Sequence, residues 1–144
     1  MNRFEANLNV LNGRNGVVSL PLRPIVSLSP STNGVLTVYD APAVIVSTDS
    51  STGALTMTLA NAEDTTIESP VKGQLLKVIR RGTNALNLQS GTLNKILKSG
   101  SGGIEAISST ANIVFGAAND SVVLQYRGEN EFLIVDVIGS ITIP

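Results

Sequence analysis

Short apolar segments recur along this chain about every 8 to 12 residues, and glycine or small polar residues separate them. Within residues 54–59 the pattern has a period of two, so that Leu55, Met57 and Leu59 share one face and two threonines share the other. This alternation is typical of a half-buried strand. No window of about 11 residues shows a helical stripe. The sequence therefore predicts an all-β fold, an antiparallel β-sandwich or barrel of the jelly-roll type.

The predicted strands are rich in Val, Ile, Leu and Thr, which favour extended backbone. They cover residues 35–39, 43–47, 54–59, 73–82, 83–90, 93–97, 104–107, 111–115, 121–126, 131–137 and 141–143. Residues 128–130, Gly-Glu-Asn, are expected to form the hairpin turn between the last two long strands.

The first thirty residues differ in amino-acid composition from the rest. We divide the chain into an extended N-terminal arm, 1–30, and a β-sandwich or barrel domain, 31–144. Pro21 and Pro24 lack the N–H that a central strand needs, yet the segment is strongly apolar. Two interpretations stay open, an edge strand with a loop on its own domain or an arm across a neighbouring subunit, and we favour the arm. The candidate partner-binding residues are chosen by their apolarity: Phe4, Leu8, Val10, Leu11 and Val17.

The low charge of the chain bears on its partners. Charged residues make up 15%, against about 25% in an average soluble domain. The surface is therefore either dressed with hydroxyl and amide groups or covered by partner subunits. A net charge of −1 gives no attraction to nucleic acid or to an anionic membrane, and we expect neither as a partner. The sequence shows no secretory signal and no apolar stretch near the roughly 20 residues that span a bilayer.

The residue types also argue against catalysis. The chain has no histidine and no cysteine, which removes the commonest general base, the thiolate nucleophile and the commonest metal ligands. Ser99 stands beside Lys98 in a glycine-rich run that is typical of a loop, and the acids at 63–64 and at 129 and 131 fall in polar turns. Arg80-Arg81 is interpreted as a polar strand end or a subunit salt bridge. We expect a protein that is not an enzyme, with no catalytic, cofactor-binding or metal-binding residues.

The second half of the chain, about residues 54–137, resembles a β module of tailed-bacteriophage virions. The stretches that carry the resemblance are 55–59, 73–82, 84–91, 121–128 and 130–135, and the closing hairpin reads SVVLQYRGENEFLIV. Tyr126 and Phe132 take the aromatic places, although a Trp-Tyr pair is frequent in the family where this chain has Phe132. Such modules occur in trimeric tail fibres and in capsid decoration (cement) proteins.

The resemblance and the layout of one arm on one β domain, without coiled-coil heptads, lead us to expect a capsid decoration protein. It would bind the outer head surface as a homotrimer, with the major capsid protein and neighbouring decoration subunits as partners. Its location would be the virion, after assembly in the host cytoplasm, and it would need no cofactor. The alternative is a receptor- or carbohydrate-binding module of a tail fibre or tail tip. Dimeric and hexameric assemblies also remain open.

Overall fold

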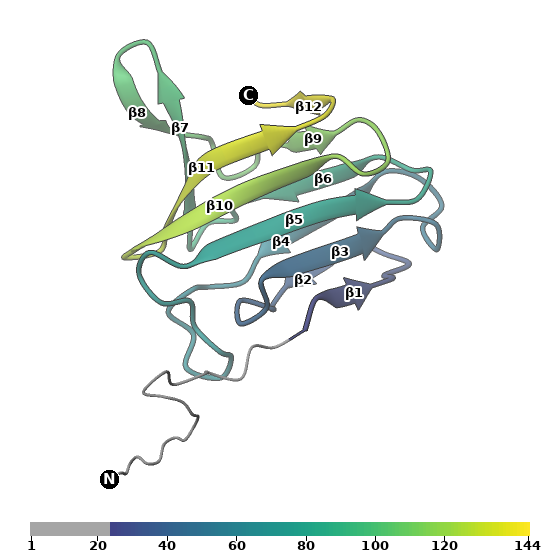
Figure 1. The fold of residues 1–144 in the computed structure, drawn as a ribbon, viewed down its shortest axis with the longest axis horizontal. Helices are drawn as coiled ribbons and strands as arrows, with labels where there is room; N and C mark the ends of the chain where they lie inside the picture. Colours follow the sequence, from purple (N-terminus) through teal and green to yellow (C-terminus); the bar gives the residue numbers. More distant parts are fainter. Residues whose placement is uncertain (1–23) are drawn as a thin grey trace, which may run out of the picture.

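The structure, a computed structural model, describes residues 24–144, which form two packed β-sheets and contain no helix (Figure 1). The strands are β1 (Val26–Leu28), β2 (Gly34–Leu36), β3 (Ala43–Ser47), β4 (Leu55–Leu59), β5 (Leu75–Arg81), β6 (Leu86–Gln89), β7 (Lys95–Gly100), β8 (Gly103–Ala106), β9 (Ile113–Phe115), β10 (Ser121–Gly128), β11 (Glu131–Ile138) and β12 (Ile141–Thr142). The all-β class and the sandwich predicted from the sequence are confirmed.

The strand order explains how the two sheets are built. One sheet has seven strands in the order β1-β3-β5-β10-β11-β7-β8, and the other has five in the order β12-β9-β6-β4-β2. From β1 to β6 the chain alternates between the sheets, so each strand's neighbour within its sheet lies two elements away in sequence. In Figure 1 the seven-stranded sheet lies in front and the five-stranded sheet lies behind it.

This winding requires a correction to the expected antiparallel arrangement, because both sheets are mixed. The pairs β1–β3, β3–β5, β2–β4, β4–β6 and β11–β7 are parallel. A chain that crosses to the opposite sheet and then returns enters its first sheet in the same direction as before, and parallel pairing follows. Antiparallel pairing appears in the second half, where the hairpins β7–β8 and β10–β11 reverse the chain within one sheet.

The core lies between the inner faces of the two sheets. Alternate residues of each long strand point into it, for example Val44 and Val46 of β3 and Leu55, Met57 and Leu59 of β4, all buried. On one side of the core Phe132 stacks on Tyr39 at a centroid distance of 5.5 Å and lies 5.0 Å from the ring of Tyr126. The alternation seen in the sequence of 54–59 therefore has the predicted meaning: the Leu and Met face is buried and the Thr face is outside.

The arm predicted at 1–30 is only partly within the described residues. Val26–Leu28, near its end, forms β1 and pairs in parallel with β3 at the edge of the seven-stranded sheet. These residues follow the edge-strand interpretation that the sequence left open. The five candidate partner-binding residues, Phe4, Leu8, Val10, Leu11 and Val17, lie outside the described residues.

Two hairpins reverse the chain within the seven-stranded sheet. Glu129 and Asn130 have φ values of 53° and 60°, which is the conformation of a tight β-hairpin turn whose twist matches that of the flanking strands. The predicted hairpin at 128–130 is thereby confirmed. The second hairpin, β7–β8, leaves the sandwich and projects from it (Figure 1).

Over the part of the chain that the structure describes, no helix is long and apolar enough to cross a membrane.

Candidate interaction surfaces

The outward face of the seven-stranded sheet carries a group of apolar side chains among polar ones. Residues that pair across strands point to the same face of a sheet, and the registers align Ile138, Ser121, Ile79 and Ile45 in one row. A second row aligns Leu133, Gln125 and Leu75. Between them Val123 pairs with both Asp136 and Lys77. We call the six apolar side chains the apolar face: Ile45, Leu75, Ile79, Val123, Leu133 and Ile138.

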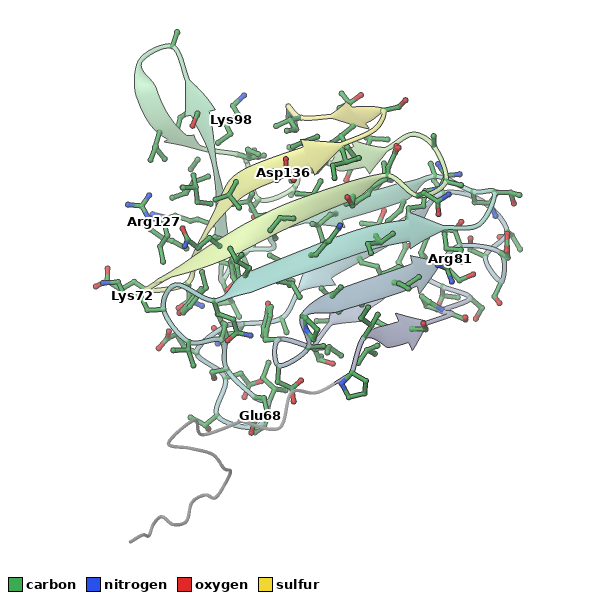
Figure 2. The ribbon with its side chains drawn as sticks, viewed as in Figure 1. Glu68, Lys72, Arg81, Lys98, Arg127 and Asp136 are labelled. Atoms are coloured by element: carbon green, nitrogen blue, oxygen red, sulfur yellow. The ribbon has the colours of Figure 1, made fainter. Side chains whose placement is uncertain are left out.

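The apolar face is accessible in the single chain. Leu75 is 51% exposed and Ile138 is 50% exposed, and the other four are half-buried among their neighbours on the sheet. Figure 2 shows this face toward the viewer, where carbon-only sticks dominate and Asp136 is one of the few polar groups. A row with Asp136 and Lys77 on either side of Val123 crosses this surface, and apolar patches with polar groups around them often mark sites of protein interaction.

The outward face of the five-stranded sheet is rich in hydroxyl and amide groups, although Val35 and Val114 lie in the same rows. Its central rows contain Thr58 beside Gln89, and Thr56 beside Asn87. These side chains bind one another and the nearby loop: Asn87 donates to Thr56, and Gln89 donates to the carbonyl of Thr110 and to Asn112. Hydroxyl and amide groups make this a surface that suits contact with water, and it meets the expectation of a polar surface with few charges for one half of the molecule only.

The edge of strand β11 is open over its second half. β7 pairs with β11 only at Glu131–Leu133 and then leaves to form the projecting hairpin with β8. At Val135 a β-bulge shifts the register between β10 and β11, and such bulges increase the local twist. Residues 134 and 136–138 are therefore paired with β10, and none of residues 134–138 pairs with a second strand of the described chain.

A groove of about 440 Å³ follows this open edge. Its apolar lining comes from Ile134, Val135 and Val137 of β11 and from Ile143 near the C-terminal end, and its rim holds Lys98 and Ser99 of β7. Val135 is 45% exposed and Val137 is 37% exposed. The backbone N–H of Val137 donates to the carboxylate of the adjacent Asp136 at 3.0 Å. The groove is thus an apolar trough beside a strand edge, and its wall is the departing hairpin.

A polar network fixes the opposite end of the same strand. The hydroxyl of Tyr126 donates to Glu63 at 2.5 Å and accepts from the backbone N–H of Asn130. The Asn130 amide donates to Asn61 and to Asn94. Asn94 is buried, and its own amide donates to the carbonyls of Leu59, Ala60 and Ser90. These bonds tie the β10–β11 turn to the loops after β4 and β6.

The two tyrosines beside Phe132 have pKa values above the ordinary range. Burial raises the pKa of Tyr39 strongly, with a smaller contribution from the nearby Tyr126, and its hydroxyl donates to the carbonyl of Ala60. Burial also raises the pKa of Tyr126, and the hydrogen bond that its hydroxyl donates to the Glu63 carboxylate raises it further. Both phenols therefore remain protonated donors, and neither is prepared to act as a base near neutral pH.

Several charged side chains have partners within the fold. Asp64 accepts from the backbone N–H and hydroxyl of Thr66, and these bonds lower the pKa of its carboxyl. Asp120 is buried and accepts from the backbone N–H groups of Ala117 and Ser140. Lys98 donates to the backbone carbonyl of Pro144. Within the described 24–144, no group of three or more acids could hold a metal ion.

Arg80 differs from the expectation of a polar strand end or a subunit salt bridge. Its side chain is 4% exposed and points into the sandwich from β5, where the guanidinium donates to the carbonyls of Phe115 at 3.0 Å and Gly82 at 3.1 Å. Its Nε has no hydrogen-bond partner. Arg80 thus joins β5 to β9 of the opposite sheet, while Arg81 is the exposed member of the pair.

The apolar face and the groove were both missed in the sequence. A signal for the face was present, because Ala43–Ser47 and Leu75–Arg81 carry apolar residues at both alternating sets of positions, which is typical of strands covered on both sides. No comparable signal marked the groove, since it depends on the point at which β7 leaves β11.

No protein-family model matches this chain, and no curated protein matches it.

Proposed function

We propose that this chain is a structural subunit of a virion, a capsid decoration protein that binds the outer head surface as a homotrimer and is not an enzyme. The observation that carries the proposal is the apolar face, which has no cover within the described chain and contrasts with the polar face behind it. A sheet face with exposed apolar side chains is expected to pack against another protein surface. The resemblance of residues 54–137 to phage virion modules is the reason for proposing the capsid as the location and a trimer as the oligomeric state.

The size of the apolar face indicates what else the assembly needs. Four strands at about 4.8 Å spacing and about six residues at 3.3 Å each give a patch of roughly 20 by 20 Å, or about 400 Å². A stable protein interface needs about 800 Å² on each partner. The apolar face therefore supplies about half of a stable interface, and further contacts must come from elsewhere in the chain.

The alternative, a carbohydrate-binding module of a tail fibre or tail tip, has less support. Sugar-binding surfaces commonly present an exposed aromatic ring, whereas Tyr39, Phe115, Tyr126 and Phe132 are all buried here. Saturable binding of this chain on a glycan array would nevertheless favour that role over the capsid role. The neighbouring genes give a second check, since capsid genes beside this one support decoration and tail genes support a fibre.

The oligomeric state tests the assembly directly. We expect the full chain to form a homotrimer in native mass spectrometry, and Leu75→Lys combined with Ile79→Lys to weaken association by about 100-fold, because two ammonium groups would be buried against apolar surface. The matched control is Val35→Lys combined with Thr142→Lys, which adds the same charge to the five-stranded face and leaves the trimer intact. A wild-type monomer at micromolar concentration, or equal loss in both variants, would contradict the proposal.

Head binding tests the capsid role itself. Where a major capsid gene lies beside the gene for this chain, head shells assembled from that capsid protein should co-sediment with the wild-type chain. The stoichiometry should be three copies at each occupied site. A trimer that does not sediment with these shells would remove the decoration role and leave only the assembly.

A further inference from the structure

We propose that the open edge of β11 accepts residues 4–10 of a neighbouring copy as an added strand. The inference rests on the proposed function, in that it requires a second copy beside the first. It begins from residues 134–138, whose backbone has a strand partner on one side only, although they lie in the most extended strand pair of the molecule. An unpaired strand edge of this kind is a template for pairing with another extended segment.

The chain itself contains a segment that fits. Residues 4–10 read F-E-A-N-L-N-V, so that Phe4, Ala6, Leu8 and Val10 alternate with Glu5 and two asparagines. This period of two gives an extended strand one apolar face and one polar face. No proline interrupts the segment, whereas the later apolar residues of the arm are followed by Pro21 and Pro24.

The groove offers the complementary surface. Ile134, Val137 and Ile143 form an apolar floor beside the open edge, and Lys98 and Ser99 stand at the rim. A strand that pairs with residues 134–138 can lay its apolar face on this floor and direct its polar face to solvent. A groove of about 440 Å³ is wide enough for several side chains of one strand.

Geometry favours a neighbouring copy over the chain's own arm. Residues 10 and 24 are fourteen positions apart, and an extended chain of that length spans at most about 50 Å. The arm joins the sheet at β1, and the groove lies beyond β3, β5 and β10 on the other side of it, at least about 19 Å away. The direct path to the chain's own groove would cross the apolar face and cover the surface that assembly needs. An arm from a neighbour leaves both surfaces available and supplies the interface area that the apolar face lacks.

Hydrogen exchange of the full chain tests the pairing. We expect the amides of residues 134–138 that face the groove to be protected in the wild type, and Leu8→Lys with Val10→Lys to speed their exchange by about tenfold or more. The matched control, Asn7→Lys with Asn9→Lys, adds the same charge to the opposite side of the same segment and should keep the protection. Free exchange at 134–138 in a wild-type trimer would overturn this inference while leaving the proposed function in place.

Disulfide trapping identifies the copy that supplies the strand. The chain has no cysteine, so a double variant Leu8→Cys with Val135→Cys contains only the designed pair. Oxidation should produce covalent dimers and larger species on a non-reducing gel, whereas Leu8→Cys with Val35→Cys, on the opposite sheet, should produce none. Cross-linked monomer alone would show that the arm binds its own groove and would overturn the exchange between copies. A protein that is monomeric in mass spectrometry would instead contradict the proposed function.

Discussion

The two outward faces of the sandwich cover the same core but differ in chemistry. The five-stranded sheet presents threonine, asparagine and glutamine, which bind one another and the adjoining loop. The seven-stranded sheet presents isoleucine, leucine and valine in rows that span β3, β5, β10 and β11. Packing of the core requires only that the inner faces be apolar, so the outer difference must have another cause. A face that remains in contact with water needs polar groups, and a face that meets another protein does not.

The strongest way to sharpen this comparison is to mutate adjacent residues on opposite faces of β11. Phe132 is 1% exposed and stacks on Tyr39, whereas Leu133 belongs to the apolar face. We expect Phe132→Ala to lower the free energy of unfolding by about 4 kcal/mol, because it leaves a cavity among aromatic rings. Leu133→Ala should lower it by about 1 kcal/mol or less and should mainly weaken association.

Urea denaturation at a fixed protein concentration measures the free energy of unfolding of Phe132→Ala and Leu133→Ala. Native mass spectrometry measures the association of the same variants. If both variants lost the same stability and neither changed association, the outward face would have to be regarded as part of the folding core.

A second test compares a buried polar side chain with one at the surface of the five-stranded sheet. Asn94 is buried and its amide binds three backbone carbonyls, whereas Gln89 forms its bonds at the exposed surface. Asn94→Ala should destabilise the fold by about 2 to 3 kcal/mol, because buried carbonyls lose their donors. Gln89→Ala should cost less than about 1 kcal/mol, since water replaces its bonds. Similar thermal midpoints for the two variants would contradict the larger contribution to stability that is expected of the buried Asn94 amide.

The smallest effect is expected from an attempt to make the polar face resemble the apolar one. Thr56→Val with Asn87→Val would place two more apolar side chains in the row that already holds Val114. Folding stability should change by less than about 1 kcal/mol, and weak self-association should appear at roughly millimolar concentration. Thr56→Ser with Asn87→Ser is the control that keeps the row polar. Light scattering that is unchanged in the Val variant would show that apolarity alone does not distinguish the two faces.

Much of the fold could be predicted from the sequence, because the position of a strand is a local property. The alternation at 54–59 and the Gly-Glu-Asn turn at 128–130 both have the predicted structure. The assignment of strands to sheets is not local, since turn residues set where the chain reverses and not which sheet receives the next strand. Five parallel pairs therefore went unpredicted.

The interaction surfaces were harder to predict for the same physical reason. The burial of Arg80 depends on the carbonyl of Phe115, which is 35 residues away in sequence. The groove depends on where β7 parts from β11, after Leu97 and Leu133. The apolar face could have been noticed in Leu75–Arg81, where apolar residues stand on both sides of the strand, but only the register with β3 and β10 joins these positions into a surface.

The winding of the chain between the sheets has a consequence for the speed of folding. Among the twelve described strands, only β7 and β10 pair with the strand that follows them in sequence, so most of both sheets cannot form by simple hairpin closure. β5 must wait for β10, about forty residues later, before its second edge is paired, and each such closure costs entropy before any contact repays it. Folding times on the order of milliseconds to seconds are expected for such topologies. During that time the rows of Ile79 and Leu75 are exposed in every nascent chain, so encounters between copies can begin before the last strand is in place.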